Sequence, residues 1–226
     1  MTIDGVATRL GPEAVVVTAE RELIVLSSAV VGGGFARARA VLNVHVPKNF
    51  ACADGEGTVA AAARRLGVPA PWVGLLTGAS TERAEMAAAA ADAVRALVVI
   101  TVGLSNPSAA GLSARAAWLP ATINTIAVVD ADPEPAALVN LVATLTEVKT
   151  DVLRAAGVCC DDGRPATGTS SDAIVVAATG RGARCRYGGP VTDVGWAAAS
   201  AARQALEAAV RRWLVEHASS RQGGPQ

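Results

Sequence analysis

The segment 36–46, ARARAVLNVHV, alternates small or apolar residues with polar ones. One side of the pattern carries Ala38, Ala40, Leu42, Val44 and Val46, and the other carries Arg37, Arg39, Asn43 and His45. Because successive side chains of a strand point to opposite faces, this period of two predicts a strand with one buried face. Its other face is polar and is available for a function.

Other runs of β-branched residues predict strands within 14–34, 72–80, 95–106, 121–130 and 172–179. The first run has a polar break at Glu20–Glu22, which predicts a hairpin whose loop is longer than two residues. These runs together predict a sheet of several strands.

Helical patterns occupy much of the rest of the chain. Residues 57–67 predict a short helix that ends at Gly67, and the alanine-rich segment before Arg95 also predicts a helix. A long helix is expected at 133–156, stopping near Gly157, with Asp132 as its N-cap and Pro133 in its first turn. Its polar face would carry Asn140, Thr144, Glu147 and Asp151, and its core stripe Leu141, Leu145, Val148 and Val152. A closing helix is expected at 194–217, with a buried stripe of Leu206, Val210, Trp213 and Leu214.

The β runs gather early and the helices follow later, which favours an α+β fold over a doubly wound one. We expect a single layered domain at 1–218, with a largely antiparallel or mixed sheet and flanking helices. The tail 219–226 is expected to be disordered.

Composition excludes several classes of protein. The chain has 20 basic and 20 acidic residues, a balance that argues against electrostatic binding of nucleic acid. No secretory signal is recognisable, and the longest apolar stretch, 87–104, is interrupted by Asp92 and Arg95. We therefore expect a soluble, cytoplasmic protein with no membrane partner. The four cysteines form no C-x-x-C pair and are expected to be reduced thiols.

Two features of the first half are candidates for a site. Glycines 32–34 lack the spacing of a nucleotide-binding motif, so a tight turn and a loop that approaches a ligand, centred on Gly33, both stay open. His45 lies on the polar side of its strand next to Asn43. Because no second His or Cys has metal-ligand spacing, no protein-bound metal is predicted.

Amide and carboxylate side chains supply candidates in the second half. Asn106 either caps a turn or orients an amide ligand. Asn124 shares a side of its strand with Thr122, and a polar pair inside a buried strand needs partners. Glu147 and Lys149 lie two residues apart on the long helix, so they do not face each other.

The segment 166–178, ATGTSSDAIVVAA, places hydroxyls and a carboxylate before a buried strand. The polar residues are Thr169, Ser170, Ser171 and Asp172. A Ser or Thr needs a neighbouring base to act as a nucleophile, and no G-x-S-x-G elbow is present. A polar turn that binds substrate is the other interpretation.

Several stretches in order resemble the adenosylcobinamide amidohydrolase family, from about Leu26 to Trp196. They are LSSAVVGGG, VLNVHV, VGLLTGAS, TVGLSNP, TINTIAVVD, TEVKTDVL, ATGTSSDAIVVAA and YGGPVTDVG. The chain differs from the usual family pattern at Phe50, Val148 and Asp193. The resemblance implies cleavage of the amide between the aminopropanol arm and the corrin ring of adenosylcobinamide, giving adenosylcobyric acid for cobalamin salvage.

The candidate residues can be assigned roles in such a reaction. For the chemistry of such an amide hydrolysis we expect Glu147 as general base and Lys149, or backbone N–H groups near Gly168, as electrostatic support. Asp172 and Thr169 would position the substrate or act as the pair of the nucleophile. Substrate-binding residues would be Ser28, Gly33, Asn43, His45, Thr77, Asn106, Asn124 and Ser170. No cofactor is expected, since the corrinoid substrate itself carries cobalt, which His45 could approach from its lower face. A non-catalytic corrinoid carrier or sensor is the alternative, and a homo-oligomer stays open.

Overall fold

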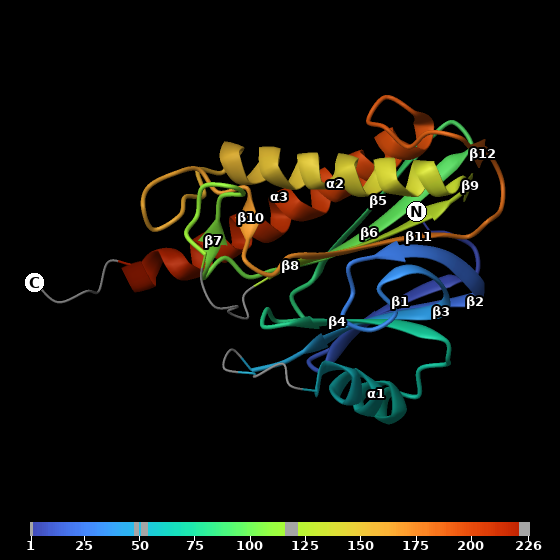
Figure 1. Ribbon diagram of the computed structural model, residues 1–226, viewed down its shortest axis with the longest axis horizontal. Coiled ribbons are helices and arrows are strands. Elements are labelled where there is room, and N and C mark those ends of the chain that lie inside the picture. The colour runs from blue at the N-terminus through green and yellow to red at the C-terminus, as the bar shows by residue number, and fades with distance from the viewer. Residues whose placement is uncertain (1, 48–49, 51–53, 116–121, 222–226) are drawn as a thin grey trace, which may run out of the picture.

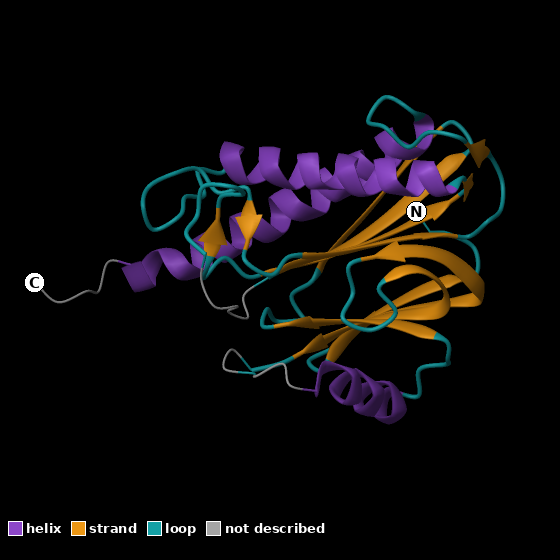
Figure 2. Cartoon of the chain, viewed as in Figure 1, coloured by secondary structure: helices purple, strands orange, loops and turns teal. Residues whose placement is uncertain are grey.

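The computed structural model describes residues 2–47, 50, 54–115 and 122–221 of the chain. Its elements form four layers in the order helix, sheet, sheet and helix (Figure 1). One outer layer is α1 (Gly55–Leu66), and the other contains α2 (Pro135–Ala155) and α3 (Asp193–Arg221). Figure 2 shows the strands between them. The predicted α+β fold with a mixed sheet and flanking helices is confirmed.

A single mixed sheet of eight strands folds over to form both inner layers. The layer next to α1 contains β1 (Val6–Leu10), β2 (Ala14–Ser27), β3 (Gly34–His45) and β4 (Trp72–Thr77). The layer next to α2 and α3 contains β5 (Glu85–Ala91), β6 (Val94–Val102), β8 (Ile123–Asp130) and β11 (Ala173–Ala178). The strand order is β4-β3-β2-β11-β8-β6-β5, and β1 pairs with β2. Among the described strands of this sheet, only β3 with β4 and β8 with β11 pair in parallel.

Two pairs of short strands lie outside the main sheet. β7 (Pro107–Ser108) pairs with β10 (Gly168–Thr169) at one end of the molecule. β9 (Asp132–Pro133) pairs with β12 (Arg184–Cys185) at the other end (Figure 1).

The predicted hairpin around Glu20–Glu22 is wrong, because β2 is one strand of 14 residues. Its pairing with β3 shifts between Thr18 and Leu23, which face Ala40 and Ala38 respectively. A bulge of this kind leaves residues unpaired and bends the strand, so it accepts the same polar residues as a turn.

The alanine-rich segment before Arg95 is also not helical. It forms β5, whose residues pair with β6 in antiparallel register from Glu85 to Ala91. Ala87, Ala89 and Ala91 pack against the core under the helices, and Ala88 packs between the sheets. Alanine favours helices intrinsically, and here the place beside β6 overrides that preference.

The start of the long helix differs from the prediction as well. Asp132 and Pro133 belong to β9, and the N-cap is Glu134, whose side chain makes no capping hydrogen bond. Pro135 occupies the first turn, where a missing N–H costs nothing. The predicted end is confirmed by the left-handed Gly157, with φ of 67°. α3 continues to Arg221, three residues after the predicted domain end at 218, and residues 222–226 lie outside the described residues.

Three apolar clusters hold the layers together. Leu42 and Val59 belong to the cluster between α1 and its sheet layer. Val17 and Val128 belong to the cluster between the two sheet layers. Leu141, Leu145, Val148, Val152, Leu206 and Val210 are buried under α2 and α3, as predicted, and Trp213 and Leu214 pack against them partly buried. Within the described residues, no helix combines the length and apolar character of a membrane span.

Candidate functional site

A chain of buried amides joins the two sheet layers at one end of the fold. Asn43 of β3 donates from Nδ2 to Oγ1 of Thr101 on β6, at 2.9 Å. Asn124 of β8 donates from Nδ2 to Oδ1 of Asn43, at 2.8 Å, and to the carbonyl of Leu76 on β4, at 2.9 Å. Only 1% of each of Asn43, Thr101 and Asn124 is exposed. Four strand ends therefore meet through side chains that lie deep in the protein.

Asn124 uses its whole side chain within the protein. Both of its amide hydrogens are donated, as above, and its Oδ1 accepts from the Thr122 hydroxyl at 2.8 Å. The same hydroxyl contacts the carbonyl of Ser171 at 2.7 Å. The predicted partners of the Thr122–Asn124 pair thus exist, and they are protein groups. Asn124 positions the strand ends.

Asp172 forms a second polar centre immediately before β11. Its Oδ2 accepts from Nζ of Lys149 at 2.5 Å and from the backbone N–H of Thr169 at 3.0 Å. Its Oδ1 accepts from the backbone N–H of Ile123 at 2.9 Å and from the hydroxyl of Thr169. The side chains of Lys149 and Asp172 are 18% and 12% exposed. Four donors therefore surround one carboxylate, and they come from α2, β8 and β10.

The local backbone explains why these groups converge. Lys149 is half-buried on the side of α2 that faces β10, and β10 brings the turn 169–172 beneath it. Gly168 lies within this contact, since an added Cβ would stand 2.4 Å from Oδ2 of Asp172 and 3.0 Å from Nζ of Lys149. Only a residue without a side chain leaves room for the ion pair.

Two further predicted residues meet beside this turn. Asn106 donates from Nδ2 to the Ser170 hydroxyl at 2.5 Å, next to the pairing of β7 with β10. The turn that contains Thr169 and Asp172 is thereby tied to the loop that follows β6.

His45 stands at the end of β3, two residues beyond Asn43, and its side chain is exposed. Its Nδ1 lies 2.9 Å from the carbonyl of Ala79. Thr77, the register partner of His45 on β4, accepts the N–H of Ala79 at 3.0 Å through its hydroxyl. Thr77 is 1% exposed, so it positions the loop that holds His45.

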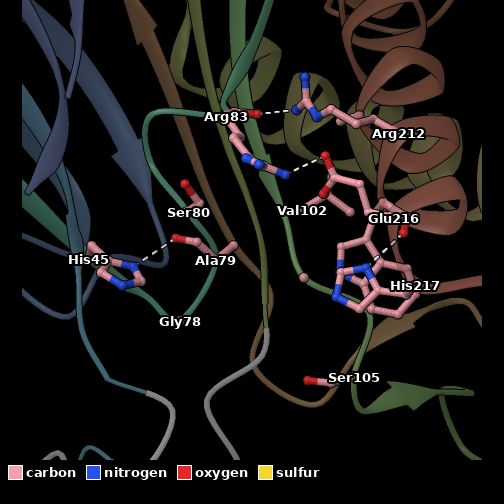
Figure 3. Close-up of a pocket in the computed structure, with 13 residues that line it drawn as sticks. His45, Gly78, Ala79, Ser80, Arg83, Val102, Ser105, Arg212, Glu216 and His217 are labelled. Carbon is pink, nitrogen blue, oxygen red and sulfur yellow. Dashed lines mark hydrogen bonds and ion pairs between the residues drawn. The ribbon is translucent and has the colours of Figure 1, made fainter. Parts of the chain in front are cut away.

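A cavity of about 330 Å³ opens beside His45 (Figure 3). One wall is the loop of Gly78, Ala79 and Ser80, and another is the end of β6 with Gly103 and Ser105. The far wall belongs to the last turns of α3 and carries Arg212, Trp213, Glu216 and His217. In Figure 3 His45 lies on the side of the cavity away from this wall, beyond the loop of Gly78, Ala79 and Ser80.

Charges on the α3 wall are paired. Arg83 forms an ion pair with Glu216, and Arg212 forms one with Glu85 and also contacts the Arg83 carbonyl. His217 stacks on Trp213 with ring centroids 4.0 Å apart and an angle of 8° between the planes. The cavity is thus lined by apolar rings, small residues and neutralised charges.

Local sequence patterns did not predict this wall of the cavity. Trp213 was predicted only as part of the buried stripe of the closing helix, and His217 was not named as a site residue. A stacked pair at positions i and i+4 of one helix is a signal that could have been used. Arg83 and Glu216 are far apart in the sequence, so their ion pair has no such local signal.

Ser28 and Gly33 have structural roles in the described chain. The Ser28 hydroxyl accepts the Ile174 N–H at 3.0 Å, which extends the pairing of β2 with β11. A Cβ on Gly33 would lie 2.6 Å from the Ala29 carbonyl, so the loop is a tight turn. Of the two interpretations for this loop, the turn is the one that these contacts support.

Glu147 lies away from the other predicted catalytic residues. It is exposed in a groove of about 420 Å³ between α2 and α3, with Asp151, Trp196 and Arg203. Among the described residues its carboxylate has no hydrogen-bond or ion-pair partner. The structure brings Lys149, Thr169 and Asp172 together and leaves Glu147 on the outer surface.

Neither a metal site nor a disulfide is evident in the described part of the chain. No three His, Cys, Asp or Glu residues gather there to bind a metal ion. Cys159, Cys160 and Cys185 are free thiols, and Cys52 lies outside the described residues. Burial raises the pKa of Cys185, with smaller contributions from Asp193 and Asp132, at the end of the fold opposite to the amides.

Comparison with known sequences decides the family. The model of the family described as adenosylcobinamide amidohydrolase matches residues 3–218, almost the entire described chain. The chain belongs to the adenosylcobinamide amidohydrolase family. The adenosylcobinamide amidohydrolase of Halobacterium salinarum is 37% identical over 143 residues, which cover 60% of this chain and 57% of that protein. The match therefore spans less than two thirds of that relative.

Solved structures show more distant likenesses. The PH0078 protein from Pyrococcus horikoshii is 14% identical, with a TM-score of 0.43 over 94% of this chain and 83% of its own. A β-aminopeptidase from a Burkholderia species is 17% identical, with a TM-score of 0.45 over 95% of this chain and 81% of its own.

Proposed function

We propose that this protein hydrolyses the amide between the aminopropanol arm and the corrin ring of adenosylcobinamide. The products are adenosylcobyric acid and aminopropanol, and the acid returns to cobalamin synthesis as a salvaged intermediate. The observation that carries the proposal is the family match over residues 3–218, which covers all four layers of the fold. The resemblance implied by the ordered sequence blocks points to the same substrate.

The polar end of the sheet suits this substrate. A corrinoid carries amides around its ring, and these bind hydroxyls, amides and backbone groups better than unpaired charges. The cavity beside His45 offers Ser80, Ser105 and two glycines, while its arginines are already paired. A volume of about 330 Å³ is too small for the corrin ring. The ring would lie across the mouth, and the arm would extend past Ser105 towards the turn 169–172, which Asn106 joins to the loop after β6.

The reaction itself needs three groups. A nucleophile adds to the amide carbon, a positive or N–H group stabilises the oxyanion, and an acid protonates the leaving amine. Water supplies the hydroxyl of the new acid and the hydrogen that leaves on the amine, so no other reactant is needed.

The Asp172 cluster is the part of the site that we assign to this chemistry. The Thr169 hydroxyl and the Lys149 ammonium are the groups that would contact the reacting amide. Asp172 accepts four hydrogen bonds within the protein, so we assign it the task of positioning both. Glu147, in its groove between α2 and α3, is not included in this set.

The test is direct incubation of the purified protein with adenosylcobinamide, followed by mass spectrometry. We expect adenosylcobyric acid and aminopropanol in equal amounts. Thr169→Val and Lys149→Met should each lower the rate by about a hundredfold, the effect of losing one transition-state contact. Glu147→Gln is the matched control on α2 and should keep full activity.

Two outcomes would contradict parts of this assignment. Binding of adenosylcobinamide without any product would make the protein a corrinoid carrier or sensor. Normal product formation by Thr169→Val and Lys149→Met, with loss of activity in Glu147→Gln, would move the chemistry to the groove between α2 and α3.

A further inference from the structure

The tautomer of His45 follows from its one hydrogen bond in the described structure. A backbone carbonyl can only accept, so the Nδ1 that lies 2.9 Å from the Ala79 carbonyl must carry the hydrogen. In the neutral imidazole, Nε2 then keeps its lone pair. The ring is held at Nδ1 by a loop that Thr77 fixes in turn. This is how proteins orient a histidine whose other nitrogen binds a metal.

The surroundings leave Nε2 of His45 accessible. The side chain is exposed at the end of β3, lines the cavity and lies beside Ala79 (Figure 3). Arg83, Glu216 and Arg212 on the opposite wall are engaged with one another or with Glu85. His217 is stacked on Trp213, and its Nδ1 lies 2.8 Å from the Trp213 carbonyl. His45 is therefore the cavity imidazole that is not stacked on a neighbouring ring.

The substrate offers a matching group. The upper axial position of the cobalt in adenosylcobinamide carries the adenosyl group. The lower position holds no base, because the arm does not yet carry one, and at most a weakly bound water that a histidine nitrogen can replace. That arm extends towards the lower face, so a protein can reach its amide from that side.

Resting on the proposed function, we infer that Nε2 of His45 coordinates the cobalt of the bound corrinoid in its lower axial position. Imidazole nitrogen is a common ligand for transition metals of this kind. The bond places the lower face of the ring over the cavity mouth. The arm can then extend past Ser105 towards Thr169 and Lys149.

The bond would also contribute to specificity. A finished cobalamin fills the same lower position with its own base, and His45 would have to displace that base. A corrinoid without a lower base meets no such competition. We expect the protein to prefer incomplete corrinoids for this reason, and His45 to be a specificity-determining residue.

Electron paramagnetic resonance of bound cob(II)inamide tests the bond. An axial nitrogen splits the cobalt lines, and the pattern changes when histidine is labelled with ¹⁵N. The chain has only 2 histidines, so the label reports on His45 and His217 alone. We expect the splitting in the wild type and in His217→Gln, and its loss in His45→Gln. The affinity of His45→Gln for cob(II)inamide should fall about tenfold or more, as for other disturbed metal contacts.

The outcomes separate this inference from the proposed function. Hydrolysis of adenosylcobinamide by a wild type that shows no nitrogen splitting would overturn the bond and leave the function standing. Splitting that survives in folded His45→Gln would also overturn it. Splitting without hydrolysis would refute the function and keep the bond. Circular dichroism of each variant establishes that it is folded.

Discussion

The two ends of β8 carry similar polar groups in different surroundings. At the start of β8, Asp172 binds the Thr169 hydroxyl and Lys149. The side chain of Asp172 is 12% exposed, and that of Lys149 is 18% exposed. At the last end, Asp130 binds the Thr179 hydroxyl at 2.7 Å and Arg181 at 3.1 Å. There the acid is 21% and the cation 40% exposed. Each carboxylate connects one end of β8 with the residues just before or just after β11.

The difference lies in what surrounds each pair. The Asp172 pair adjoins the buried amides of Asn43 and Asn124, which lead on towards His45 and the cavity. In the Asp130 pair, the Arg181 guanidinium also donates to the carbonyl of Asp4 and so holds this segment against the strand ends. An ion pair at a strand end is thus a poor sign of a site by itself. Convergence of several elements on one half-buried group is the better sign.

Removing the carboxylate at each end of β8 should give the largest difference in stability between the two ends. Asp172→Ala leaves Lys149 half-buried without its partner, and we expect a loss of about 3 kcal/mol in the free energy of unfolding. The rate of adenosylcobinamide hydrolysis should fall by about a hundredfold. Asp130→Ala is the matched control, and because its partner reaches solvent we expect about 1 kcal/mol or less. Urea titration and product analysis measure both, and equal losses at the two ends would erase the contrast.

Gly168→Ala should come next in size. The new Cβ would stand 2.4 Å from Oδ2 of Asp172, so the contact with Lys149 must open. We expect about 2 kcal/mol of destabilisation from the overlap, with at least about a tenfold loss of rate. Gly189→Ala serves as the control, since a Cβ added there would meet nothing within 4 Å beyond its chain neighbours. A fully active Gly168→Ala would show that the close contact is unnecessary.

Asn124→Leu tests the buried amides. It keeps the branched shape of the side chain but leaves the Asn43 oxygen and the Leu76 carbonyl without their donor. The expected loss is about 2 kcal/mol. Thr179→Val at the other end removes one hydroxyl bond to Asp130 and should cost about 1 kcal/mol. Thermal unfolding of the two variants, at one pH and salt, is sufficient. A smaller loss for Asn124→Leu would mean that the amides do not support the fold.

The smallest effect on stability is expected from the titration of Cys185, which lies at the end of the fold opposite to the buried amides. Burial, with Asp193 and Asp132, raises the pKa of this thiol above its ordinary value of 9.0. The folded state then keeps a proton that the unfolded state loses. Stability is therefore full below pH 9.0 and falls as the pH rises through the folded pKa. The difference between wild type and Cys185→Ala in urea midpoint should shrink over that range, and a constant difference would contradict the shift.

Much of the fold was readable from local patterns. Strand β3 and the core stripe of α2 follow directly from their periods, and Gly67 and Gly157 end their helices as predicted. The errors came from tertiary context. Glu20–Glu22 marks a bulge in β2, because bulges and turns accept the same residues. The alanines of β5 lie in a sheet because β6 and α3 cover them.

The site was predicted in part for a similar reason. Local sequence shows that Thr169 and Asp172 precede a buried strand and that Asn43 faces away from the apolar side. It does not show that Lys149 meets Asp172 across 23 positions, or that Asn124 meets Asn43 across 81. Glu147 shows that closeness in sequence can also mislead, because it lies two residues from Lys149 and yet outside the cluster. Two residues along a helix are enough to turn a side chain from the ion pair to the outer groove.

The length of β2 has a consequence for the whole molecule. Its first half lies between β1 and β3, and its last residues pair with β11 in the other layer. One uninterrupted backbone therefore belongs to both inner layers, so the two layers are halves of one sheet that bends along β2. Shear between the layers would have to stretch this backbone. The distance between His45 on one layer and Ser105 on the other is thus under mechanical restraint, even in a protein whose cavity is open to water.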